Sequence, residues 1–466
     1  MSRCQNPCIL TLFGGTGNLA YKKLIPALYH LFAEDKLPKC FYVLSVGRRE
    51  YTKETYQESI KSYLDDDSTF DEDVWNKFAK IIGYFPLDFN EESHYIALSN
   101  HLKKLDSIYG TKNNRLFYFA VAPQYFELIS KRLVTYNLLE DNSGFHRVVF
   151  EKPFGKNLET AKSFNRILRE CFDEKQIYRI DHYLGKEMIQ NILVLRFANR
   201  LFEEIWCKNG IEKIHIKALE TVGVGKRGGY YDNAGALRDM VQNHLLQILA
   251  LIAMDPPKNF DTESIRNEKV KVLSNLKLHK INGKSDIVLG QYEGYLKEDQ
   301  VQPNSLTETY VKLSCAVDTN RWQGVPFILE TGKKLDQKKA EIEIYFKPHS
   351  SKYTPDGIET FPNRLIIRIQ PSEGVFLEMN VKKPGLELEI DRVNMEYCQS
   401  CKTLIHSPEA YEKLITDIID GDSTLFARWD EIEASWTFVD KLLECCSLDR
   451  RYLKIYSPGK RGPNDV

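Results

Sequence analysis

Short apolar runs alternate with amphipathic stretches over residues 1–178. The apolar runs have the length of strands buried on both faces, and the stretches between them have the spacing of helices. The first helix is expected from Asn18 to about Ala33, with Pro26 bending it. This alternation is typical of a doubly wound parallel sheet. Strands are predicted at Cys8 to Phe13, Phe41 to Val46, Leu116 to Ala122 and Arg147 to Phe150.

The pattern changes in residues 179–466. Two helical stretches, near Lys186 to Glu203 and Ala234 to Ala253, precede a series of alternating apolar and polar runs. Such runs favour a largely antiparallel sheet with helices on one side. The fold class expected is α/β followed by α+β, with a Rossmann-like domain at 1–178 and a second domain at 179–466. The alternating runs are Thr309 to Val317, Glu341 to Phe346, Arg364 to Gln370 and Val375 to Val381.

Charge and composition exclude several classes of protein. The 466 residues carry 64 basic and 65 acidic side chains, a formal charge of -1, so no overall basic field is available to hold nucleic acid or an anionic membrane. No stretch approaches the roughly 20 apolar residues that span a bilayer, and Met1 to Leu10 lacks the apolar centre of a secretory signal. A cytoplasmic protein is therefore expected. The ten cysteines are scattered, which fits reduced thiols, and Cys398 and Cys401 form a lone CxxC without a second pair.

A glycine-rich turn follows the first predicted strand. Glycines let such a turn be tight and let backbone N–H groups approach a pyrophosphate, whose charge is favoured by the start of the next helix. The spacing of Gly14, Gly17 and Ala20 departs from GxGxxG, so the prediction depends on the position directly after a strand. The residues expected to bind a dinucleotide are Gly14, Gly15, Thr16, Gly17, Asn18 and Leu19.

Two arginines indicate which dinucleotide to expect. NAD sites usually place Asp or Glu at the end of the second strand to bind the ribose hydroxyls, whereas a 2′-phosphate calls for Arg. Here the strand runs into Arg48 and Arg49, with no carboxylate before Glu50. A guanidinium matches phosphate oxygens in a bidentate geometry, so NADP is the predicted cofactor. The alternative is that both arginines only solvate a loop. Pro123 is expected to shape the adjoining wall of the cofactor site.

Two further runs combine residues with useful chemistry. EKPFG begins at Glu151, at the carboxyl end of a predicted strand where ligands of open α/β sheets bind, and its Lys152 can donate to cofactor and substrate. RIDHYLGKE begins at Arg179 and places a carboxylate and several phosphate-competent donors around Gly185. A solvated helix face remains the alternative for the second run, because charged residues are common on surfaces. Its candidate residues are Asp181, His182, Tyr183 and Lys186.

These motifs, with others in the same order along the chain, resemble those of the glucose-6-phosphate dehydrogenase family. DHYLGKE looks like the signature of that family, and the resemblance covers essentially the whole chain. The matching motifs are GGTGNLA at Gly14, EKPFG at Glu151, RIDHYLGKE at Arg179, RGGYYDNAG at Arg227, RDMVQNHLLQ at Arg238, VPFILETGKKL at Val325 and IRIQPSEG at Ile367.

The resemblance implies oxidation of beta-D-glucose 6-phosphate to 6-phosphoglucono-δ-lactone by hydride transfer to NADP, the first step of the oxidative pentose phosphate pathway. It implies NADP binding by 1–178, substrate binding and oligomerisation by 179–466, and a homodimer or homotetramer. It assigns His244 as the general base and Asp181 as its carboxylate partner. The substrate-binding residues that it implies are Lys152, His182, Tyr183, Lys186, Glu220, Asp239, Lys333, Lys338 and Gln370, and Lys23 joins the cofactor pocket.

One residue departs from the family pattern. Asn18 stands where the family usually has Asp after the third glycine, which removes a carboxylate near the helix start. Asn is a good helix cap, so the turn is expected to survive. The chain is shorter than animal members, and its sequence gives no basis for their second, structural NADP site.

The implied chemistry fits the residue types. Removing the anomeric proton while hydride leaves the same carbon requires a base with a pKa near neutrality, as histidine has, and no metal is expected. By itself, His244 beside its apolar run is more simply a hydrogen-bonded buried histidine, and the family motif around it favours the base. Two other functions stay open: a sugar oxidoreductase of the glucose-fructose oxidoreductase kind, which needs no phosphate cradle, and a non-catalytic NADP-binding sensor, which needs no base.

Overall fold

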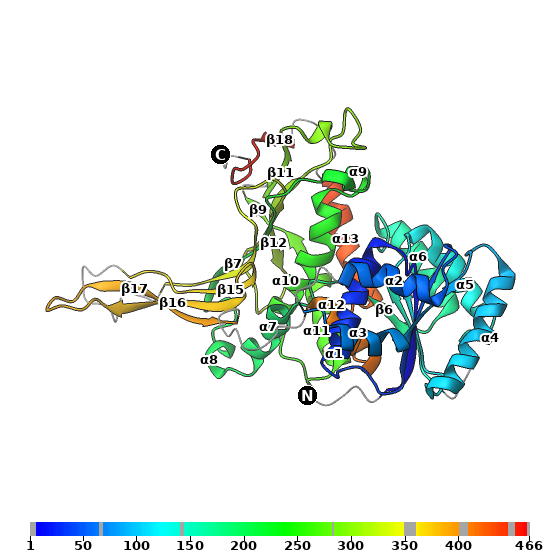
Figure 1. The fold of residues 1–466 in the computed structure, drawn as a ribbon. Helices are drawn as coiled ribbons and strands as arrows, with labels where there is room; N and C mark the ends of the chain where they lie inside the picture. The colour runs from blue at the N-terminus through cyan, green and yellow to red at the C-terminus, as the bar shows by residue number, and fades with distance from the viewer. Residues whose placement is uncertain are drawn as a thin grey trace. The chain divides into compact units, whose positions relative to one another are not determined.

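The computed structural model describes residues 6–64, 69–139, 144–281, 284–348, 360–399, 409–445 and 453–463. They form two compact units (Figure 1). Unit 1 combines Met1–Gly155 and Glu159–Gly185 with a distant segment, Pro408–Trp429. Unit 2 combines Lys156–Leu158, Lys186–Ser407 and Asp430–Val466. The division of the sequence into domains after residue 178 stays a prediction.

Unit 1 is built on a parallel sheet with the strand order β3-β2-β1-β4-β5-β6. The predicted Rossmann-like architecture is confirmed, and every residue of β1 and β2 is buried, as expected for strands covered on both faces. Two short strands, β3 and β6, were not predicted. The strands are β1 (Cys8–Phe13), β2 (Phe41–Gly47), β3 (Ile82–Pro86), β4 (Arg115–Phe119), β5 (His146–Phe150) and β6 (Ile177–Arg179).

Helices flank this sheet. The first helix begins at Asn18, as predicted, and runs through a π-helical segment, η1 (Ala20–Leu24), into α1 (Ile25–Ala33), where Pro26 lies in the first turn of the α-helical part. A proline is tolerated there because the first-turn N–H groups have no intrahelical partner. The other helices are α2 (Lys53–Leu64), α3 (Glu72–Phe78), α4 (Glu92–Tyr109), α5 (Phe126–Thr135), α6 (Leu158–Cys171) and α12 (Ala410–Asp420).

The predicted strand from Leu116 to Ala122 is wrong at its end. β4 stops at Phe119, after which the Ala120 N–H still donates to the Phe13 carbonyl at 2.9 Å. The chain then turns into a 3₁₀ helix that begins at Pro123, whose ring nitrogen has no N–H to continue a strand ladder.

Unit 2 contains a large mixed sheet with the order β17-β16-β15-β14-β7-β13-β12-β11-β18, and β8 also pairs with β12. Most pairs are antiparallel, as predicted, while β7 with β13 and β11 with β18 are parallel. β16 and β17 extend from the sheet as a long arm (Figure 1). The strands are β7 (Ile211–Leu219), β8 (Leu276–Leu278), β11 (Ile287–Tyr292), β12 (Tyr310–Val317), β13 (Phe327–Gly332), β14 (Lys339–Phe346), β15 (Arg364–Gln370), β16 (Gly374–Lys382), β17 (Ile390–Cys398) and β18 (Leu453–Tyr456), with a separate pair of β9 (Lys280–Ile281) and β10 (Lys284–Ser285).

The helical stretch predicted from Ala234 to Ala253 is interrupted. Gly235 has φ +67° and ψ 175°, and a Cβ on it would lie 2.4 Å from the Glu308 carboxylate. That carboxylate accepts the Leu237 N–H at 2.9 Å, so it caps the helix that starts anew there. The helices of this unit are α7 (Glu187–Phe197), α8 (Arg200–Glu203), α9 (Gly228–Ala236), the π-helix η6 (Leu237–Leu245), α10 (Leu246–Ala253), α11 (Thr262–Ser274) and α13 (Trp429–Cys445).

Two expectations about composition are tested by the described residues. None of their helices is long and apolar enough to cross a membrane. Cys398 forms a disulfide, so the expectation of reduced thiols is wrong for that residue, and Cys401 lies outside the described residues. Other cysteines are free thiols, including Cys8, Cys40 and Cys315.

Candidate active site

The carboxyl edge of the parallel sheet gathers most candidate residues of unit 1. Parallel strands all end at the same edge, and ligands of open α/β sheets bind there. Going from β2 through β1, β4 and β5 to β6, the segments that leave this edge carry Arg48, Gly14, Pro123, Lys152 and Asp181 in turn. The outer two are four strand spacings apart, about 19 Å. The sequence candidates are therefore brought together as one row.

The glycine turn is held against the neighbouring strand by its own backbone. The N–H groups of Gly14 and Gly15 both donate to the Val46 carbonyl, at 2.8 and 3.0 Å, and Gly14 has φ +83°. A Cβ on Gly15 would lie 2.5 Å from the Ser45 Cβ, so no larger residue fits. Since those N–H groups are used inside the turn, a pyrophosphate would take its hydrogen bonds from the N–H groups at the start of η1.

Asn18 does not cap the following helix. Asn18 is exposed and is itself the first helical residue, so it lies one position after the N-cap. The capping role expected of Asn18 is therefore wrong, and the helix opens with the Tyr21 N–H, which donates to the Gly17 carbonyl at 3.1 Å.

Three predicted cofactor-binding cations lie on the segments around this turn. Arg48 and Arg49 are exposed directly after β2, and the Arg49 carbonyl accepts a hydrogen bond from the Tyr84 hydroxyl at 2.8 Å. Lys23, on η1, pairs with Glu409 at 3.3 Å, and both side chains are about half exposed. A pair this exposed contributes little to stability, so Lys23 can exchange its partner for a ligand.

Glu151 anchors the strand end that carries Lys152, a role that the sequence analysis did not find. Its carboxylate accepts hydrogen bonds from the hydroxyls of Tyr118 at 2.6 Å and Tyr411 at 3.3 Å. Burial raises the pKa of Glu151, and these two hydrogen bonds oppose the rise. The Lys152–Pro153 peptide bond that follows is cis. No sequence signal connects Tyr411 to this site, because it comes from the distant segment of unit 1.

The run after β6 forms a tight polar turn. Asp181 is buried, and its carboxylate accepts the Tyr183 N–H at 2.9 Å. The rings of His182 and Tyr183 meet edge to face with centroids 5.1 Å apart. Gly185 is required by packing, because a Cβ there would lie 2.7 Å from the Ala410 carbonyl oxygen. The turn therefore fixes Asp181, His182 and Tyr183 relative to one another.

Unit 2 holds a second group of candidates, among them Lys186 and Gln370. The Lys186 ammonium donates to the Gln370 side-chain oxygen at 2.8 Å. The Lys186 charge also lowers the pKa of Glu373, although burial outweighs it and the net shift is upward. The cation predicted to bind a phosphate is thus hydrogen-bonded to an amide and interacts electrostatically with one carboxyl, that of Glu373.

Glu220 and Lys333 meet because two parallel strands end together. Leu219 of β7 pairs with Gly332 of β13, and the next residue on each strand is the candidate. The Lys333 ammonium forms an ion pair with the Glu220 carboxylate and lies 5.1 Å from the centre of the Tyr231 ring. Lys338 is exposed in the segment before β14.

Asp239 and His244 both lie on η6, which packs against β7 and β13. In a π-helix the backbone hydrogen bonds join residues five apart, so these two residues lie one turn from each other. π-helical segments recur at functional sites. His244 is 1% exposed, and Asp239 accepts a hydrogen bond from the Tyr230 hydroxyl at 3.2 Å. Burial and the Asp239 charge raise the pKa of Tyr230, so this hydroxyl stays a donor near neutral pH.

Comparison with known proteins identifies the family. The models for the glucose-6-phosphate dehydrogenase NAD binding domain and C-terminal domain match residues 11–191 and 193–466. The chain belongs to the glucose-6-phosphate dehydrogenase family. Its sequence is 40% identical to the glucose-6-phosphate 1-dehydrogenase of Bacillus subtilis and 42% identical to that of Streptococcus pneumoniae, covering 99% and 98% of this chain and 96% and 93% of theirs.

Solved structures of the family have the same fold. A glucose-6-phosphate dehydrogenase in complex with its substrate glucose-6-phosphate superposes with a TM-score of 0.91 at 34% identity, covering 100% of this chain and 97% of that one. The Mycobacterium avium glucose-6-phosphate 1-dehydrogenase superposes with a TM-score of 0.85 at 32% identity, covering 98% of this chain and 95% of that one. Levoglucosan dehydrogenase, with a TM-score of 0.52 at 8% identity, shares the fold alone.

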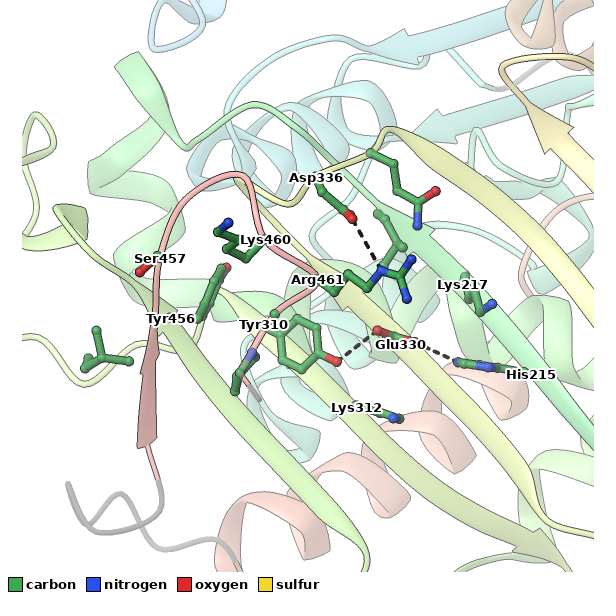
Figure 2. Close-up of a pocket in the computed structure, with 15 residues that line it drawn as sticks. His215, Lys217, Tyr310, Lys312, Glu330, Asp336, Tyr456, Ser457, Lys460 and Arg461 are labelled. Atoms are coloured by element: carbon green, nitrogen blue, oxygen red, sulfur yellow. Dashed lines mark hydrogen bonds and ion pairs between the residues drawn. The ribbon is translucent and has the colours of Figure 1, made fainter. Parts of the chain in front are cut away.

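A cavity of about 830 Å³ in unit 2 of this glucose-6-phosphate dehydrogenase family member lies outside the predicted site. Figure 2 shows its polar lining, in which Glu330 interacts with His215 and Tyr310. Its carboxylate pairs with His215 at 2.8 Å and accepts the Tyr310 hydroxyl at 2.9 Å. Burial raises the pKa of Glu330, but the interactions with His215, Tyr310 and Lys312 together outweigh it and the net shift is downward. None of the candidate site residues lines this cavity.

Proposed function

We propose that this chain oxidises beta-D-glucose 6-phosphate to 6-phosphoglucono-δ-lactone with NADP, and so opens the oxidative pentose phosphate pathway. The observation that carries the proposal is the match to glucose-6-phosphate dehydrogenases over the whole chain at about 40% identity. The candidate residues support it, because a histidine base, a carboxylate partner and cations for the phosphates all lie among the described residues.

NADP fits the residues at the carboxyl edge of unit 1. The pyrophosphate would lie at the start of η1, and the 2′-phosphate beside Arg48, Arg49 and Thr16. Bound NADP supplies the hydride acceptor. Pro123 and Lys152 would border the nicotinamide half, since they leave strands on the far side of β1.

The phosphate of the sugar would bind to His182, Tyr183 and Lys186, where a charged ammonium and two hydrogen-bond donors match phosphate oxygens. The sugar hydroxyls would take their hydrogen bonds from the remaining polar candidates. These are Lys152, Glu220, Asp239, Lys333, Lys338 and Gln370.

His244 would take the proton of the anomeric hydroxyl while hydride leaves the same carbon. A neutral imidazole is suited to this step near pH 7. The carboxylate of Asp181 would fix the histidine tautomer and stabilise the imidazolium. Asp181 belongs to unit 1 and His244 to unit 2, so their joint action is tested by mutation.

The first experiment measures the absorbance of the reduced cofactor, NADPH or NADH, with glucose 6-phosphate, glucose or no sugar, each with NADP or NAD. The proposal is supported if NADPH forms fast with glucose 6-phosphate and not with glucose or without sugar. Equal rates with glucose would favour a sugar oxidoreductase of the glucose-fructose oxidoreductase kind, and binding of NADP without turnover would favour a sensor. The homodimer or homotetramer, like the cytoplasmic location, stays a prediction, and light scattering of the purified protein tests the oligomer.

The second experiment tests the base. His244→Asn is expected to lower kcat at least 100-fold, roughly the lower end for a general base, with both Michaelis constants within a few-fold of wild type. Asp181→Asn should lower kcat by no more than His244→Asn does. The fall in kcat of the double variant should be far smaller than the product of the two single falls.

His215→Asn is the matched control, because it also removes a partly buried histidine that pairs with a carboxylate in unit 2. It should leave kcat unchanged. Near-normal turnover of His244→Asn would move the base elsewhere, with Asp239 the first candidate.

A further inference from the structure

We infer that the hydroxyl groups of Tyr56 and Tyr84 are positioning groups for NADP: Tyr56 holds the glycine turn, and Tyr84 holds the turn that carries Arg48 and Arg49. The inference rests on the proposed NADP-binding role of these two turns. Neither tyrosine belongs to a motif in the sequence, and both lie in unit 1.

Tyr56 links the glycine turn to β2. It lies on α2 with its side chain fully buried, and its hydroxyl donates to the Gly15 carbonyl at 2.8 Å. The same oxygen is 2.6 Å from the Ser45 Oγ. A hydroxyl carries one proton, so the Ser45 hydroxyl donates to Tyr56 in turn. The carbonyl of the turn is therefore fixed by a buried chain of two hydroxyls.

Tyr84 links the arginine turn to β3. Its hydroxyl donates to the Arg49 carbonyl at 2.8 Å. A Cβ on Gly47 would lie 3.0 Å from that hydroxyl and 3.3 Å from the Thr16 Oγ1. The absence of a side chain at Gly47 thus lets Tyr84 and Thr16 approach the same point, where the two turns meet.

The two tyrosines also support each other. Their ring centroids are 4.8 Å apart, and Tyr51 packs edge to face on Tyr84 at 5.5 Å. Burial raises the pKa of Tyr84 to about 12, so its hydroxyl remains a donor at neutral pH. A displacement at either turn would therefore have to move a packed aromatic cluster.

The two hydroxyls make different predictions, because NAD and NADP share the pyrophosphate but only NADP has the 2′-phosphate. Tyr84→Phe frees the arginine turn and should weaken NADP binding by about 3- to 10-fold, the range of one hydrogen bond, with NAD binding within 2-fold of wild type. Tyr56→Phe frees the shared turn and should weaken both cofactors by a similar factor.

The test measures dissociation constants of NADP and NAD for the full chain without sugar, by titration calorimetry, after each variant's melting curve confirms folding. Tyr29→Phe is the matched control. It removes a buried hydroxyl that makes two hydrogen bonds with the Asp71 backbone, at 3.1 and 2.8 Å, away from both turns. It should lower the melting temperature and leave both dissociation constants unchanged.

Gly47→Ala is the second variant, because its Cβ would crowd the Tyr84 hydroxyl and the Thr16 Oγ1 without deleting either group, and it should weaken NADP more than NAD. The inference is overturned if Tyr84→Phe weakens both cofactors equally, or if Tyr29→Phe reproduces its effect. A wild-type protein that binds neither cofactor would refute the proposed function instead. If tight NADP binding is lost in Arg48→Ala but kept in Tyr84→Phe, this inference is refuted and the proposed function is not.

Discussion

Replacing Lys269 with methionine should destabilise unit 2 strongly without touching the proposed site. Lys269 on α11 and Glu431 on α13 form an ion pair at 2.7 Å, and both side chains are fully buried. At an effective dielectric constant of about 20, their attraction is ~6 kcal/mol. Removing two charges from water costs several kcal/mol for each, so the intact pair nearly balances that cost. Lys269→Met removes this ion-pair partner from the buried Glu431 carboxylate.

The expected loss for Lys269→Met is therefore about 3 to 5 kcal/mol. For a unit of this size, each kcal/mol lowers the melting temperature by about 2 to 4 °C, which gives a fall of roughly 6 to 20 °C. Calorimetry of the purified protein measures it. Adding Glu431→Gln replaces the buried carboxylate with a neutral amide and should recover most of the loss.

Lys383→Met is the matched control. Lys383 makes a contact of similar length with Glu389, 2.8 Å, but both side chains are more than half exposed, so no measurable shift is expected. A double variant that is as unstable as the two single losses added together would refute the reasoning, because the loss would then come from packing and not from the removal of the Lys269 charge beside Glu431.

Three further predictions address the proposed site and the pH dependence of stability. Arg48→Ala should raise the Michaelis constant for NADP about 10- to 100-fold, the loss expected for a charge-assisted hydrogen bond, with a smaller change for NAD, and steady-state kinetics with each cofactor would expose an equal loss. Lys186→Ala should weaken glucose 6-phosphate binding while slow oxidation of glucose is kept, because only the phosphorylated sugar uses that charge; equal loss with both sugars would make Lys186 structural. Burial raises the pKa of Asp417 to about 6, against the opposing charge of Lys413. The contribution of Asp417 to folding stability is then fully favourable only below its pKa in the unfolded chain, near 3.9, and is lost as the pH rises through about 6, its pKa in the folded chain. The melting temperature of Asp417→Asn relative to wild type should accordingly rise between pH 4 and pH 7, and a constant difference would contradict this.

The sequence by itself determined the elements whose signal is local. The strand Cys8 to Phe13 was predicted with its observed bounds, since six consecutive residues that are buried on both faces need no partner to be recognised. The glycine turn, the arginine pair and the family motifs were also readable, because each is a short run whose chemistry depends on neighbours in sequence. The strand after Leu116 was predicted too long. Its end depends on a tertiary contact, because the glycine turn after β1 brings Gly14 close to the Ala120 carbonyl.

Only the tertiary structure decided the features that join distant residues. The apolar pattern around Asp239 and His244 predicts an ordinary helix, whereas the break at Gly235 depends on the carboxylate of Glu308, and the segment after it is a π-helix. Tyr411 reaches Glu151 because a late segment of the chain packs into unit 1. Hydrogen bonds and buried charges of this kind leave no periodicity in the sequence, since their energy depends on distance and burial, which exist only once the chain has folded.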